Sequence, residues 1–204
     1  CPIAAPSANL SGSPSPTTAA HVYQDMNGRI PLIIDGGECA NGVESTVICF
    51  TDGGTGIKVL RPGVITAEML SQFAKTETDK NVFAKPDANE KVISPGVKYK
   101  HYSPRADITI IETDSDKALA EFLNGCNDGG TYGVIFGTEK GIEIPTISYG
   151  TTAQEQSHNL FAVLRKTDEL GAVRAFVRCP EKIGVGTAVY NRLLRAAAFK
   201  TIKL

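Results

Sequence analysis

Hydrophobic and polar positions follow a regular alternation in the second half of the chain. After residue 105, short apolar runs alternate with longer stretches in which apolar residues recur every three or four positions. Strands are expected at 107–112, 132–136 and 173–178. Helices are expected at 116–124, 152–170 and 187–199. Strands that alternate with helices of this length predict parallel βαβ units, and therefore a small doubly wound parallel α/β domain over residues 105–204.

The pattern before residue 76 is shorter and less regular. Ser15 followed by proline suits the N-cap of a helix that ends near Gly28. Residues 31–35 read as a short buried strand. Further strands are expected at 45–50 and 57–60, and Thr66 is expected to cap a helix that runs to about residue 73.

A polar stretch separates the two patterns. Residues 76–90 contain almost no apolar repeat, which is typical of a linker. The chain is therefore divided into a first α/β unit at 1–75, a linker or lid at 76–104, and the small α/β domain at 105–204.

Composition and charge narrow the function classes. The 204 residues carry 21 Lys and Arg against 22 Asp and Glu, a net charge of -1, and a dedicated nucleic-acid binder usually has a basic excess. No apolar run approaches the ~18 residues of a membrane span. The 5 cysteines are an odd number without C-x-x-C spacing, which predicts free thiols and a cytoplasmic protein. The basic residues of the last segment are matched by acidic ones, so a solvated face is expected for Arg174, Arg178, Lys182, Arg192 and Arg195.

The densest chemical signal is a loop rich in hydroxyl, Gly and Pro residues over 5–17. It contains Ser7, Asn9 and Ser15 and leads into the first predicted helix, whose N-terminal N–H groups suit a phosphate. Composition alone favours a capped surface turn over a phosphate-binding loop.

Two further candidates lie near strand ends. Arg61 follows an apolar strand and precedes Pro-Gly, where a planar guanidinium could bind phosphate in a bidentate manner. Ser45 begins another strand and could direct its hydroxyl into a cleft. The alternatives are a solvated arginine and an ordinary turn.

The segment 94–104 is unusual for a tether. It places two tyrosines, a histidine and two lysines between prolines. Aromatic and cationic groups fixed in this way suggest a strap over an anionic or aromatic ligand, with a strap that packs only on protein as the alternative.

Taken together, these segments resemble one family. Residues 5–12, 15–17, 35–37, 44–47 and 60–63 resemble the C-terminal half of a YrdC-type domain. Residues 94–104 resemble the tether of two-domain threonylcarbamoyl-AMP synthases, and 159–161, 184–186 and 191–193 resemble their smaller C-terminal domain. The N-terminal half of the YrdC-type domain is absent from this sequence, so the resemblance implies a fragment that is inactive alone.

The resemblance implies a reaction and a set of partners. Such enzymes condense L-threonine, bicarbonate and ATP, with Mg²⁺, into threonylcarbamoyl-AMP and pyrophosphate, and another enzyme complex transfers the threonylcarbamoyl group to tRNA. It assigns ATP contacts to these residues: Ser7, Asn9, Ser15, Arg61 and, from the tether, Tyr99. It assigns L-threonine contacts to Ala5 and Ser45 and no metal ligand to a protein side chain. Direct binding of tRNA is expected to be weak or absent, and no contact with a membrane is expected.

Three other functions stay open at this point. One is an RNA-binding module without catalysis, which the net charge disfavours. Another is a transferase that adenylates a carbamoyl group for a different acceptor. The last takes Cys1 as the N-terminal nucleophile of an amidohydrolase.

Overall fold

A computed structural model describes residues 1–2, 6–85 and 102–204 of the chain. The described residues 6–85 are called the N-terminal region below, and residues 104–204 the C-terminal unit. Ala5 and Tyr99 lie outside the described residues, as does most of the predicted tether.

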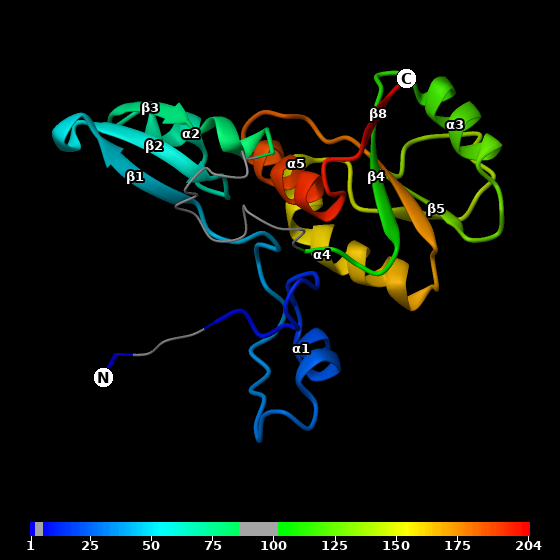
Figure 1. The fold of residues 1–204 in the computed structure, drawn as a ribbon, viewed down its shortest axis with the longest axis horizontal. Coiled ribbons are helices and arrows are strands. Elements are labelled where there is room, and N and C mark those ends of the chain that lie inside the picture. Colours follow the sequence, from blue (N-terminus) through cyan, green and yellow to red (C-terminus); the bar gives the residue numbers. More distant parts are fainter. Residues whose placement is uncertain (3–5, 86–101) are drawn as a thin grey trace.

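The C-terminal unit is built on one parallel sheet. Its strands are β4 (Asp107–Glu112), β5 (Thr131–Ile135), β6 (Thr146–Ser148), β7 (Arg174–Arg178) and β8 (Thr201–Lys203), in the order β6-β5-β7-β4-β8. Every neighbouring pair in this sheet is parallel. Figure 1 shows α3 (Asp116–Gly125) apart from the paired helices α4 (Ala153–Glu169) and α5 (Val185–Ala196).

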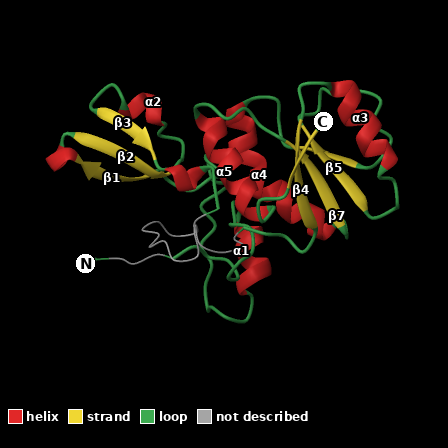
Figure 2. Cartoon of the chain, turned by 45° about the horizontal axis from the view of Figure 1, so that its top comes forward, coloured by secondary structure: helices red, strands yellow, loops and turns green. Residues whose placement is uncertain are grey.

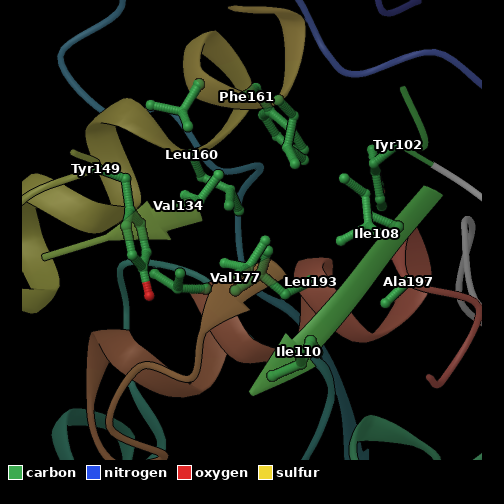
Figure 3. Packing of buried hydrophobic residues seen from close by; sticks show 14 of the residues in the cluster. Tyr102, Ile108, Ile110, Val134, Tyr149, Leu160, Phe161, Val177, Leu193 and Ala197 are labelled. Carbon is green, nitrogen blue, oxygen red and sulfur yellow. The ribbon is translucent and has the colours of Figure 1, made fainter. Parts of the chain in front are cut away.

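Alternate residues of β4 explain the two packed faces of this sheet. Ile108 and Ile110 point to a core formed with α4 and α5, while Ile111 joins a second cluster with Leu119 and Leu123 of α3. Figure 3 shows residues of the larger cluster, among them Phe161, Val177 and Leu193. Helices cover both faces of a parallel sheet, so the predicted doubly wound α/β domain is confirmed.

The N-terminal region has a different construction. Its helix α1 (Ala19–Met26) stands apart from a sheet in the order β1-β2-β3. Strands β1 (Val47–Thr51) and β2 (Gly56–Arg61) form an antiparallel hairpin around the single-turn 3₁₀ helix η1 (Asp52–Gly54), and β3 (Lys75–Thr78) pairs parallel to β2. Short helices follow β2 and β3: α2 (Ala67–Leu70) and η2 (Lys80–Val82). Figure 2 shows α4 and α5 between the two sheets, with α1 beside α4.

Several expected elements differ from the structure. The first helix begins at Ala19 with Thr18 as its N-cap, so Ser15 is not the cap. Residues 31–35 form no strand, and Leu32 and Ile34 are exposed, because no described strand pairs with this short apolar run. The proposed domain boundary at 75/76 falls inside β3, whose polar residues gave no strand signal.

The predicted elements of the C-terminal unit fit closely. Strand β4 has the expected bounds, and α4 begins and ends within a residue of the expected ones. Thr152 and Glu155 form a complete capping box at its start. None of the helices in the described ranges is long and apolar enough to cross a membrane.

Candidate functional site

The loop before α1 is shaped by Asn9. Its side-chain amide donates hydrogen bonds to the carbonyls of Leu10 at 2.9 Å and Ser13 at 3.0 Å, which hold a tight turn that Gly12 enters with φ of +85°. Its Oδ1 is buried and accepts no hydrogen bond. Ser7 is exposed earlier in the same loop.

Ser15 lies after this turn and is bound to Glu44. The Ser15 hydroxyl donates a hydrogen bond of 2.8 Å to Glu44 Oε1. Burial alone would raise the pKa of Glu44, but the charge of Arg192 and the hydrogen bonds from Arg192 and Ser15 hold it below its usual value. Glu44 is therefore an anion at neutral pH that joins the loop to the strand hairpin.

Arg61 and Ser45 meet where the β1–β2 hairpin opens. The Arg61 Nε donates to the Ser45 carbonyl at 3.1 Å, and one Arg61 Nη lies 3.5 Å from the Ser45 hydroxyl. A Cβ at Gly63 would come within 2.5 Å of the Thr46 nitrogen, so only glycine allows the chain after Arg61 to pack so closely on residues 44–46. The close packing of Gly63 on residues 44–46 and the pairing of β1 with β2 thus place Arg61 beside Ser45.

Three predicted site residues therefore converge on Glu44. Ser15 binds its carboxylate, Ser45 follows it in the chain, and Arg61 bonds to Ser45. Ser45 also lines a hollow of about 500 Å³ whose wall includes Val43, Ile48 and Val64. Hydroxyls, one guanidinium and an adjoining apolar hollow are suited to a small ligand that carries both phosphate and apolar groups.

The described end of the tether joins two parts of the molecule. Tyr102 is buried against Phe161, with ring centroids 5.1 Å apart. The Ser103 N–H donates to the Gly12 carbonyl at 2.9 Å, and its hydroxyl donates to the Ala196 carbonyl at 3.1 Å. The end of the tether thus fastens the Asn9 loop to the end of α5.

Sequence reasoning missed the arginines of α5. Arg192 is fully buried and Arg195 is 2% exposed, so the expected solvated face is wrong for both. The sequence does indicate that Arg192 is buried, because it falls in the apolar stripe that includes Val189 and Leu193. Arg178 is also largely buried, between Glu139 and Asp116.

Arg195 lies beside Arg192 with fewer partners. It donates to the Asn81 carbonyl and lies 4.7 Å from the centre of the Phe199 ring. Burial, together with the charge of Arg192, lowers its pKa to about 10. It still carries its proton at neutral pH.

The C-terminal unit has a hollow of its own. About 450 Å³ opens at the carboxyl ends of β4, β5 and β7, where ligands commonly bind in open α/β sheets. Two of its basic groups are already paired, Lys182 with Glu112 and Arg178 with Glu139. Burial raises the pKa of Cys179 there to about 11, so its thiol is a poor nucleophile at neutral pH.

The described residues offer no ready-made metal cage. Among them, His, Cys, Asp and Glu form no group of three or more that could hold a metal ion. Glu44, the acidic group of the site, is occupied by Arg192 and Ser15. A divalent cation that arrives with a nucleotide commonly keeps most of its coordination to phosphate and water.

Comparisons with known proteins agree on one family. The family profile described as threonylcarbamoyl-AMP synthase, C-terminal domain, matches residues 65–198, and a profile described as telomere recombination matches residues 1–63. The threonylcarbamoyl-AMP synthase of Pyrococcus abyssi is 37% identical over 207 residues, covering 100% of this chain and 60% of that protein. The Bacillus subtilis synthase is 40% identical over 210 residues, covering 99% of this chain and 59% of its own.

A solved structure gives the same result. The crystal structure of P. abyssi Sua5 complexed with L-threonine superimposes with a TM-score of 0.82 at 36% identity, over 98% of this chain and 58% of that one. The chain thus spans roughly three fifths of the length of these relatives. The matched profiles, the relatives and the shared fold together mean that this chain belongs to the threonylcarbamoyl-AMP synthase (Sua5) family.

Proposed function

We propose that the protein, in its full natural length, is an L-threonylcarbamoyladenylate synthase. It would condense L-threonine, bicarbonate and ATP to threonylcarbamoyl-AMP and pyrophosphate, for later transfer to tRNA by other enzymes. The observation that carries the proposal is the convergence of Ser15, Ser45 and Arg61 around Glu44 in a chain of this family. The P. abyssi relative that binds L-threonine supports the choice of amino acid.

The proposed contacts divide between the two substrates. Ser7, Asn9, Ser15, Arg61 and Tyr99 would contact ATP. Ala5, through its backbone, and Ser45 would contact L-threonine. The Arg61 guanidinium, held by Ser45, would offer its remaining N–H groups to phosphate oxygens.

The chemistry asks for positioning rather than for a covalent intermediate. The threonine amine and bicarbonate combine to a carbamate and release water. A carbamate oxygen then attacks the α-phosphorus, and the bond to pyrophosphate breaks in line with the attack. Residues that align the reactants, neutralise phosphate charge and exclude water would supply the rate enhancement.

The substrates, the cysteines and the net charge support proposals for the metal, the cellular location and the binding of tRNA. Mg²⁺ would be bound mainly through the phosphates of ATP, because the described residues hold no acidic cluster for it. The 5 cysteines are free thiols, which supports the cytoplasm as the place of action. The net charge of -1 supports weak or no direct binding of tRNA, so the product would pass to a separate tRNA-modifying enzyme.

Pyrophosphate release tests the proposal. The full-length protein is incubated with ATP and Mg²⁺, and L-threonine and bicarbonate are omitted in turn. Release that requires both is the expected result. Release without threonine would favour a carbamoyl-adenylating enzyme for another acceptor, and no release would overturn the synthase. Cys1→Ala is expected to leave the rate unchanged, whereas an amidohydrolase with an N-terminal cysteine nucleophile would lose its activity.

A further inference from the structure

We infer that Arg192 of the C-terminal unit is a positioning residue for the substrate site of the N-terminal region, an inference that rests on the proposed function. Arg192 touches neither Ser45 nor Arg61 in the described contacts. It binds the residue directly before the first, Glu44, and the residue directly after the second, Pro62.

The contacts use most of the guanidinium. Arg192 Nε donates to Glu44 Oε2 at 2.8 Å, one Nη donates to the Pro62 carbonyl at 2.8 Å, and the other donates to the Glu44 carbonyl at 3.2 Å. The first Nη also bonds to Asn191 Oδ1 at 3.0 Å, and Asn191 in turn donates to the Val82 carbonyl at 2.7 Å. One side chain therefore fixes both chain segments that carry Ser45 and Arg61.

The same arginine reaches Ser15 through one carboxylate. Glu44 accepts from Arg192 on one oxygen and from Ser15 on the other. If Glu44 turned away, Ser15 would lose its partner as well. Three proposed substrate contacts on separate segments are thus oriented from a single buried point.

Burial makes this arrangement specific to arginine. Arg192 is fully buried on α5, so its charge depends on Glu44 for compensation. Its acceptors lie in several directions around a planar group. A lysine could keep the ion pair, but its single ammonium could not reach the Glu44 and Pro62 carbonyls together. Replacement by lysine therefore keeps the charge at this position but loses the hydrogen-bond geometry, so the two contributions can be measured separately.

Arg195 provides a matched control. It lies on the same helix, is equally buried, and also donates across to the N-terminal region, but to Asn81. Its described contacts include neither Glu44 nor Pro62. If Arg192 only stabilised the contact between the two regions, its replacement should affect activity no more than the replacement of Arg195.

The experiment compares Arg192→Met, Arg192→Lys, the double variant Glu44→Gln/Arg192→Gln and Arg195→Met in the full-length protein. The folded fraction of each is measured by urea denaturation, and kcat and KM for ATP and L-threonine are expressed per folded molecule. Hydrogen exchange is followed in the segments 44–47 and 62–65. The lysine and double variants leave no unpaired charge, so they report on the site even if Arg192→Met does not fold.

The expected result is a loss of about tenfold or more in kcat/KM for the Arg192 variants, including Arg192→Lys, with faster exchange in both segments. Arg195→Met is expected to stay within about twofold of the parent. Parent-like kcat/KM and exchange in Arg192→Lys and the double variant would overturn the inference while the synthase proposal stands. If the parent itself releases no pyrophosphate, the synthase proposal fails, and unchanged exchange would overturn the positioning role separately.

Discussion

The two parts of the molecule are stabilised in different ways. The C-terminal unit buries apolar residues of its three central strands, β4, β5 and β7, in two clusters, one on each face of its sheet. The N-terminal region contributes few residues to the buried core: Val43, Ile57, Val59 and Val82. It is held instead by polar contacts to buried arginines of α4 and α5, such as the Arg165–Asp25 pair at 2.7 Å.

The groups proposed to bind substrates and the core that stabilises the fold therefore lie in different parts of the molecule. The proposed substrate residues that the structure describes, Ser7, Asn9, Ser15, Ser45 and Arg61, lie on the region with little core of its own. The arginines that hold this region lie on the C-terminal unit, which has a large buried core. The C-terminal unit therefore supports the region that carries the proposed substrate site. Substitutions in the two regions should accordingly have different consequences.

The largest expected effect comes from the shared core. Phe161 is fully buried and packs on Tyr102 at the junction of the two regions. Phe161→Ala should lower the free energy of unfolding by about 3–5 kcal/mol, measured by urea denaturation. Phe50→Ala, at a side chain 70% exposed in β1, should stay within about 0.5 kcal/mol. Equal losses at both positions would contradict the contrast between the regions.

Arg61→Ala should separate activity from stability. Loss of a charged hydrogen-bond donor to phosphate should lower kcat/KM by about 100-fold, with little change in the urea midpoint. Lys58 lies on the same strand and pairs with Glu77 at the surface, so Lys58→Ala should change kcat/KM by less than about twofold. A similar loss in both variants would remove Arg61 from the proposed ATP site.

A smaller effect is expected at the start of α4. The Thr152 side chain accepts a hydrogen bond from the Glu155 N–H, so Thr152→Ala should cost about 1 kcal/mol of stability. KM for ATP and threonine should not change in the folded enzyme. A raised KM would mean that the site depends on features of the C-terminal unit other than Arg192.

The smallest effect is a pH dependence at the same cap. Hydrogen bonds from the backbone of Thr152 and Thr151 lower the pKa of Glu155 below its unfolded value of 4.5. The stabilisation from this carboxylate is thus complete above that value and is lost as the pH falls through the folded pKa. Glu155→Gln should flatten the fall of stability between about pH 5 and 3, measured by urea midpoints. An unchanged dependence of the urea midpoint on pH would show that the Glu155 carboxylate does not stabilise the cap.

The C-terminal unit could be predicted from its sequence because its signals are local. Amphipathic spacing and a capping box define α4 within a residue of its observed bounds. Strands β3, β6 and β8 gave little signal, because they are only 4, 3 and 3 residues long, too short to show a clear alternation of apolar and polar positions. The apolar run at 31–35 shows the reverse error, since no described strand pairs with it.

The site could be predicted only in part. Ser15, Ser45 and Arg61 carry hydroxyl and guanidinium groups in Gly- and Pro-rich loops, and such loops can be recognised in a sequence. Their convergence depends on Glu44 and Arg192, which are 148 positions apart. Balanced charge suggested that Arg192 was solvated, because composition does not indicate which cations are buried by a distant carboxylate.

The most direct test of the account is detection of the product. The full-length protein would be incubated with ATP, Mg²⁺, L-threonine and bicarbonate carrying a heavy carbon isotope, and the nucleotides analysed by mass spectrometry. The account predicts an adduct of AMP and threonine that contains the labelled carbon and is absent without either substrate. Turnover of ATP with no labelled adduct would contradict it.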